Sequence, residues 1–158
     1  MVKQKNSFSE EKFQKLLDKV YRFLSFRPRS EKEITDYFKK RKIADDITQK
    51  LFKILREQQL IDDFAFAQWW VEQRENFRPK GKIGLKVELK QKGINTQIIE
   101  KILIQVDEIA LAKKAVQKKI KIYKKLPPKE FYQKISTFLS SRGFSWPTIK
   151  KIIEDYYH

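Results

Sequence analysis

The same pattern of residues occurs three times along the chain, and this repeat constrains the fold more than any other feature. Each copy starts with a helical pattern that ends at a proline: Pro28, Pro79, and Pro127 with Pro128. A second landmark follows about fifteen residues later: Lys42-Ile43, Gly93-Ile94 and Gly143-Phe144. Apolar pairs then recur in phase: Leu51/Phe52, Ile102/Leu103 and Ile152/Ile153. With a period close to 50 residues, each copy is typical of a helix, a proline turn, a helix, a short turn and a third helix.

Local signals support these helices one by one. Phe13, Leu17, Val20 and Leu24 follow the spacing of a one-sided amphipathic helix. Ser30 and Glu33 form a capping box, in which each side chain bonds to the other residue's backbone N–H. The remaining start signals are Asp62 or Asp63, Asn95 or Thr96, Pro128, and Ser145 with Pro147.

The segment 82–90 carries two competing signals. Its apolar and polar residues alternate, which indicates a strand, and Gly84 disfavours a helix interior by about 0.5–1 kcal/mol. Its apolar residues also form pairs four positions apart, and a lone strand would have no partner in this chain. The equivalent segments of the other copies are helical in pattern, so we predict a helix here.

The fold class predicted from these patterns is all-α: a tandem array of three three-helix modules that resemble helix-turn-helix units. The modules are expected over residues 1–61, 62–106 and 107–158, with residues 1–8 as a flexible N-terminus. Units of this size are small for independent stability, so each module should be stabilised by packing against its neighbour. An elongated or curved array is therefore expected.

Charge is the compositional outlier. The chain has 36 basic and 20 acidic residues, a net charge of +16. The modules carry +7 (16 basic, 9 acidic), +2 (8 basic, 6 acidic) and +7 (12 basic, 5 acidic). A field this positive favours a polyanionic partner, because binding releases counterions from phosphates. The alternative interpretation is general solubility, or a lysine-rich proteome.

Several functional classes lack their residues. There is no cysteine, the only histidine is His158, and no phosphate-binding glycine loop is present. Asp62 and Asp63 are a candidate metal pair, but no further acid converges on them, so helix capping is the favoured interpretation. We expect no enzyme activity, no cofactor and no metal. With no apolar run long enough for a membrane span and no signal peptide at the start, a cytoplasmic protein without membrane contact is expected.

The candidate partner-binding residues are basic. Guanidinium groups match phosphate and carboxylate geometry better than lysine does, which favours Arg27, Arg29, Arg74 and Arg78. The other candidates are Lys80, Lys82, Lys118, Lys121, Lys124 and Lys125. The lysines of the last long helix have an alternative interpretation as a solvated surface, and Lys39–Lys42 as partners of a helix dipole. Trp70 is predicted to face the core, with Trp69 more exposed and a candidate for base stacking or packing between modules.

An ordered set of motifs resembles one known family. The segment 60–67 (LIDDFAFA), then Arg74, 78–81 (RPKG), Leu89 and 92–94 (KGI) is similar to the central signature of the RecX family. The segment 27–34 (RPRSEKEI) is similar to the motif that opens its first module. The similarity extends over residues 11–106, and the third module resembles the family in pattern only. The chain departs from the family at Arg41-Lys42-Ile43, where Lys-Gly is common.

The resemblance implies a function without catalysis. A protein of this family is expected to bind the filament of the recombinase RecA on DNA, to lie in its helical groove, and to limit filament growth and strand exchange. It is also expected to bind single- and double-stranded DNA itself, as a monomer. Two alternatives remain open: a plain DNA-binding protein of helix-turn-helix type, and a helical scaffold for an acidic protein partner.

Overall fold

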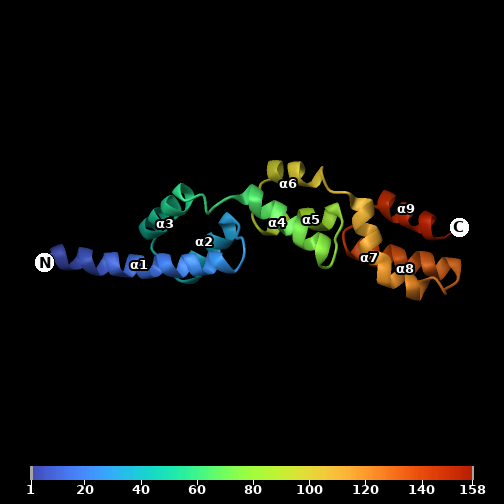
Figure 1. Cartoon of the computed structure of the whole chain (residues 1–158), viewed down its shortest axis with the longest axis horizontal. Coiled ribbons are helices and arrows are strands. Elements are labelled where there is room, and N and C mark those ends of the chain that lie inside the picture. Colours follow the sequence, from blue (N-terminus) through green and yellow to red (C-terminus); the bar gives the residue numbers. More distant parts are fainter. Residues whose placement is uncertain (1, 158) are drawn as a thin grey trace. The chain divides into compact units, whose positions relative to one another are not determined.

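The computed structural model describes the backbone of residues 2–157 and the side chains of residues 10–157. Within this part every regular element is a helix (Figure 1). The helices are α1 (Val2–Phe26), α2 (Glu31–Lys40), α3 (Asp45–Glu57), α4 (Asp63–Asn76), α5 (Lys82–Gln91), α6 (Thr96–Leu103), α7 (Glu108–Tyr123), α8 (Pro128–Ser141) and α9 (Trp146–Tyr156). The predicted all-α fold of tandem three-helix modules is confirmed, including the helix over the ambiguous segment 82–90.

The chain forms two compact units, Met1–Phe66 and Ala67–His158. The first contains α1, α2 and α3, which meet around one apolar core. The buried residues of this core are Leu17, Val20, Ile34, Phe38, Leu51, Phe52 and Leu55. They come from the amphipathic stripes that the spacing predicts on all three helices.

The second unit contains α4 from Ala67 onward and all of α5 to α9. Leu85, Leu89 and Ile99 are fully buried in the middle module, and Phe131, Ile135 and Ile152 are nearly or fully buried in the last. Pro128 occupies the first turn of α8, as predicted. In the described part of the chain, no helix is both long enough and apolar enough to span a membrane.

The second sequence landmark of each module is a helix end with one shared geometry. Lys42, Gly93 and Gly143 all have a left-handed backbone, with φ of 55°, 79° and 76°. The next N–H in each case donates to the third carbonyl from the end of the second helix: Ile43 to Phe38, Ile94 to Leu89, and Phe144 to Leu139. This is the Schellman motif, which favours glycine at the left-handed position.

Gly84 is explained by a close approach within the second unit. The backbone N–H groups of Gly81, Ile83 and Gly84 donate to the carbonyls of Arg142 and Gly143, at 3.0–3.3 Å. The turn between α8 and α9 therefore caps the first turn of α5. A Cβ on Gly84 would lie 2.9 Å from the Arg142 carbonyl oxygen, and one on Gly143 would overlap the Gly84 backbone. Backbone contact of this kind joins the middle and last modules.

The predicted helix caps are present, and Asp63 caps a helix other than its own. Ser30 and Glu33 form the capping box of α2, and Asn95 caps α6 by accepting from the Ile98 N–H. Asp62 caps α4 by accepting from the Ala65 N–H at 3.0 Å. Asp63 instead accepts from the Glu31 N–H at 2.8 Å, at the start of α2. The backbone of α1 includes residues 2–8, but their side chains lie outside the described residues, so the flexible N-terminus remains a prediction.

Candidate nucleic-acid interface

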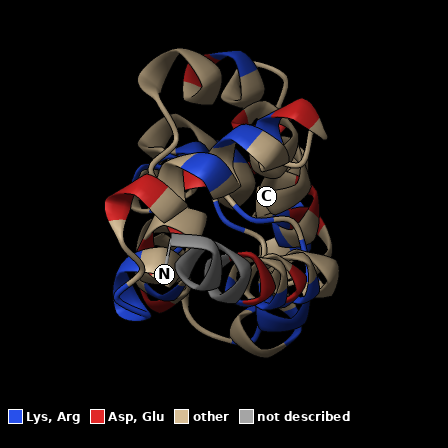
Figure 2. Ribbon diagram, turned by 90° about the vertical axis from the view of Figure 1, so that its left-hand side faces the viewer, with Lys and Arg blue, Asp and Glu red and all other residues tan. Residues whose placement is uncertain are grey.

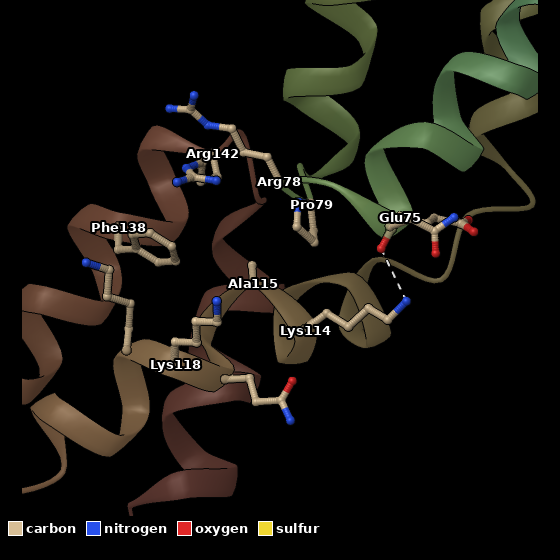
Figure 3. Close-up of a pocket in the computed structure, with 11 residues that line it drawn as sticks. Glu75, Arg78, Pro79, Lys114, Ala115, Lys118, Phe138 and Arg142 are labelled. Carbon is tan, nitrogen blue, oxygen red and sulfur yellow. Dashed lines mark hydrogen bonds between the residues drawn. The ribbon is translucent and has the colours of Figure 1, made fainter.

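A basic cleft lies in the second unit, between the end of α4, the face of α7 and the end of α8 (Figure 3). Its volume is about 500 Å³. Five cations line it: Arg78, Lys114, Lys118, Lys119 and Arg142. The remaining lining residues are Glu75, Asn76, Pro79, Ala115, Gln117 and Phe138. With one carboxylate against five cations, the cleft has the charge of a site for a polyanion.

Two arginines stand close together at one end of the cleft (Figure 3). Arg142 ends α8 as its C-cap residue, and burial lowers its pKa, with further lowering by the charges of Arg78 and Arg74. Within the described residues, neither Arg78 nor Arg142 has a carboxylate partner. Two cations that lack a counter-charge repel one another. Binding of an anion between them therefore lowers the free energy.

The backbone of Arg78 has a conformation that ordinary residues avoid. Its φ is 56°, in the left-handed region where a side chain carries a steric cost. The residue follows the end of α4 and precedes Pro79, and its side chain lines the cleft. Arg78 thus bears a steric cost that glycine would not, at a position where its guanidinium lines the cleft.

An aromatic ring borders the same cations. The Arg142 guanidinium carbon lies 5.0 Å from the centroid of the Phe138 ring, and the Lys119 Nζ lies 5.7 Å from it. Phe138 is half-buried on α8. A ring flanked by cations suits an unpaired base, because stacking and phosphate contact are then made in one place.

The corresponding place in the middle module is occupied by a buried carboxylate. Glu88 lies four residues before the α5 C-cap, as Phe138 lies four before the α8 C-cap. Its Oε2 accepts from the Trp70 Nε1 at 2.6 Å and from the Arg74 Nε at 2.9 Å. Its Oε1 lies 2.6 Å from the Lys80 Nζ. Arg74 and Lys80, both predicted as partner-binding residues, are thus paired inside the protein.

Glu88 stays ionised in spite of its burial, because its partners are cationic. Burial alone would raise its pKa, but the bonds from Lys80 and Arg74, aided by Trp70, outweigh it and hold the pKa below the ordinary value. Only 8% of Glu88 is exposed.

Trp70 is half-buried, and its N–H donates to this carboxylate. It therefore belongs to the polar cluster around Glu88, and the prediction that it faces the apolar core is only partly right.

The two arginines predicted in the first module are also engaged locally. Arg27 pairs with Glu33 of the capping box. Arg29 lies over the Phe23 ring at 4.0 Å and donates to the Phe23 carbonyl. Burial, together with the charge of Arg27, lowers the pKa of Arg29. Both side chains therefore help to fix the turn between α1 and α2.

The structure brings together only part of the predicted set. Arg78 and Lys118 line the cleft, whereas Lys121, Lys124 and Lys125 are exposed around the C-terminal end of α7 and do not line it. Lys82 is the first residue of α5. Sequence reasoning missed Lys114, Lys119 and Arg142 as cleft residues. One signal was available for Arg142, because Arg41 and Lys92 occupy the same C-cap position in the other modules.

Lys and Arg are spread over several of the helices (Figure 2). The described residues contain no group of three or more His, Cys, Asp or Glu that could hold a metal ion. Asp62 and Asp63 are each occupied by a backbone N–H instead. The arrangement around the cleft is therefore one of binding groups: cations, an aromatic ring and amides.

Three family models match the chain in order. They are described as the first, second and third three-helix domains of RecX, and they match residues 17–51, 62–103 and 106–153. The regulatory protein RecX of Streptococcus pyogenes serotype M5 (strain Manfredo) is 40% identical over 130 residues, which are 82% of this chain and 50% of the relative. That of Streptococcus equi subsp. zooepidemicus (strain MGCS10565) is 35% identical over 136 residues, 85% of this chain and 53% of the relative.

Solved structures agree with these relatives. The crystal structure of RecX from Lactobacillus salivarius matches with a TM-score of 0.80 at 26% identity, covering 93% of this chain and 97% of that one. A crystal structure of regulatory protein RecX matches with a TM-score of 0.77 at 30% identity, covering 93% of this chain and 75% of the other. The chain spans about half the length of the curated relatives it matches. By its three matched domains, the chain belongs to the RecX family.

Proposed function

We propose that this protein is a non-catalytic regulator that binds the recombinase RecA filament on DNA and limits its strand exchange and ATP turnover. Two findings support this: the chain belongs to a family whose relatives carry the name regulatory protein, and its second unit has a cleft with the charge of a polyanion site. In this proposal the protein works in the cytoplasm as a binding module.

The observation that carries the DNA part is a pair of arginines, Arg78 and Arg142, that have no carboxylate partner in the described part of the chain. Arg78 and Arg142 lower the free energy of the complex when a phosphate binds between them, since each guanidinium offers two parallel N–H donors. Lys118 and Lys119 extend the positive surface along α7 for the next phosphates. An unpaired base beside them stacks on Phe138, which favours single-stranded DNA.

The test measures both binding and regulation. We expect the double variant Arg78→Gln with Arg142→Gln to bind a single-stranded oligonucleotide about tenfold more weakly. The slope of log affinity against log salt should fall by about 0.7, because the phosphate between the two arginines contributes about 0.7 on single strands. The same variant should inhibit DNA-dependent ATP hydrolysis by the recombinase less than the unchanged protein does.

The matched control is Lys121→Gln with Lys125→Gln, which removes the same charge outside the cleft. An equal loss of affinity in both double variants would show that net charge alone binds DNA. If the unchanged protein at saturation leaves strand exchange and ATP turnover of the recombinase unaltered, the regulatory proposal is wrong. Inhibition that only follows competition for DNA and vanishes with salt would favour a general DNA-binding protein.

A further inference from the structure

The first unit has a basic groove of its own, separate from the cleft described above. It lies between α1 and the turn from α2 to α3 and has a volume of about 550 Å³. Its cations are Lys12, Lys15, Lys19, Arg41 and Lys42. Its apolar residues are Phe13, Leu16, Ile43, Ala44 and Ile47. Among the described residues that line it, none is acidic.

The groove differs from the cleft in the character of its floor. Phe13, Leu16, Ile43 and Ile47 are half-buried, packed on the core of the first unit with part of each side chain left in solvent. The lysines and Arg41 stand around this apolar floor. A ligand that fits must therefore supply both apolar side chains and negative charge. Glu10 and Asp46 line a neighbouring cavity that shares Phe13 and Ile47, so the basic region ends on that side.

The Tyr37 ring, which Arg41 of the groove covers, offers no open face to a base. Tyr37 stacks on Phe23, with centroids 4.2 Å apart, and the Arg41 guanidinium carbon lies 3.7 Å over the Tyr37 ring. Two groups this close to one ring must occupy opposite faces. Both faces of Tyr37 are thus covered, whereas base stacking needs an uncovered one.

We infer that this groove docks an acidic segment of a protein partner. The segment places apolar side chains, spaced about one helical turn apart, on Phe13, Leu16 and Ile47. Its carboxylates meet Lys15, Lys19 and Arg41. The mode is that of an amphipathic helix in a hydrophobic groove with a charged rim. This inference goes beyond the proposed function, because it assigns protein binding to the first unit from the chemistry of the groove alone.

The test uses the whole chain and two labelled peptides of about four helical turns. One peptide has Glu and Asp with Leu at two positions a turn apart, and the other has Ser in place of each Leu. Fluorescence anisotropy measures their affinities. The groove variant is Lys15→Glu with Lys19→Glu, both exposed on α1. The matched control is Arg22→Glu with Lys53→Glu, which makes the same charge change on exposed residues outside the groove. Circular dichroism verifies that all variants are folded.

We expect the Leu-containing peptide to bind about tenfold more tightly than the Ser-containing one. The groove variant should lose about tenfold in affinity for it, and the control about twofold. Affinity for a single-stranded oligothymidine should change equally in the two variants. Equal loss of peptide binding in both variants, equal binding of the two peptides, no saturable binding, or a loss confined to the oligothymidine in the groove variant would each overturn the inference. The peptide arms contain neither recombinase nor DNA, so their failure leaves the proposed function standing.

Discussion

In both the middle and the last module, cations surround the residue four positions before the C-cap of the second helix. This cluster, the corner of the module, has a different role in each. In the middle module the residue four before the second helix's C-cap is Glu88, and it holds Trp70, Arg74 and Lys80. In the last module that residue is Phe138, and the cations around it have no carboxylate partner among the residues that the structure describes. Where the acidic side chain of Glu88 is present, the neighbouring cations form ion pairs within the protein. Where Phe138 takes its place, the cations remain available to a ligand.

Both corners depend on the glycine contact between α5 and the turn after α8, and breaking it should give the largest effect. Gly143→Ala places a Cβ against the Gly84 backbone at a φ of 76°. We expect a loss of about 3 kcal/mol or more in the free energy of unfolding, from left-handed strain plus overpacking. Urea unfolding followed by tryptophan fluorescence measures it.

Gly93→Ala is the matched control for this substitution. It introduces the same side chain at the equivalent left-handed position, with φ of 79°, where the residue is exposed. Only the conformational cost applies there, about 1–2 kcal/mol. Equal losses at positions 93 and 143 would mean that the contact with Gly84 contributes nothing.

Removing the acid from the middle module tests whether it is what distinguishes the two corners. Glu88→Gln leaves Arg74 and Lys80 without their counter-charge, and we expect the unfolding free energy to fall by about 2 kcal/mol. The released cations should at the same time raise the affinity for single-stranded DNA about threefold. Titration of a labelled oligonucleotide together with urea unfolding gives both values. A variant that loses stability and binds DNA no better would show that the cations of this module face away from any ligand.

The reverse exchange gives the last module the acid of the middle one. Phe138→Glu should place a carboxylate beside Arg142 and Lys119. We expect affinity for single-stranded DNA to fall by about 1.5–2 kcal/mol, since a stacking surface is lost and one negative charge is added beside the two cations. Phe138→Leu removes only the ring and should cost about 1 kcal/mol. If the two variants bind equally, the charge introduced at this position does not reach the ligand.

The sequence predicted what depends on neighbours along the chain. Helix ends at prolines and the capping box of Ser30 and Glu33 follow from spacing within a few residues. The helical choice for the segment around Gly84 needed the repeat as well, because its local pattern alone was ambiguous. The pairing of Glu88 with Lys80 and Arg74 joins residues 8 and 14 positions apart, across two helices. No local pattern indicates such a contact, because it depends on how the helices pack.

The same reason explains the incomplete prediction of the cleft. Arg78 and Lys118 were selected for residue type, but Arg142 joins them only because the turn after α8 lies on the start of α5. Of the two alternatives predicted as the cap of α4, Asp62 is the cap, whereas Asp63 caps α2 through a contact distant in sequence. A repeat alignment carries part of this information, since equivalent positions of the modules fold alike.

Acid should weaken the middle module through Glu88. Its folded-state pKa lies below the ordinary value of 4.5, so its contribution to stability is complete above that pH. The contribution is lost as the pH falls through the lower folded-state pKa. The difference in unfolding free energy between the unchanged protein and Glu88→Gln should therefore shrink as the pH is lowered from 6 toward 3. Urea unfolding at several pH values measures it, and a difference that is constant over this range would contradict the assignment.

The smallest effect concerns the left-handed residue that is glycine in the middle and last modules and lysine in the first. Lys42 has a φ of 55° and is exposed. Lys42→Gly should therefore stabilise the first unit by about 0.5–1 kcal/mol. This value is the strain energy that is relieved, minus the cost of ordering glycine, which is more flexible in the unfolded chain. Lys42→Ala keeps the strained backbone and removes only the charge, so it should leave stability almost unchanged. Because Lys42 lines the groove of the first unit, both variants should weaken binding of the acidic peptide by the same factor. Higher stability together with weaker peptide binding in Lys42→Gly would show that this turn gives up stability for binding. Finding Lys42→Gly no more stable than Lys42→Ala would show that no such exchange is made at this turn.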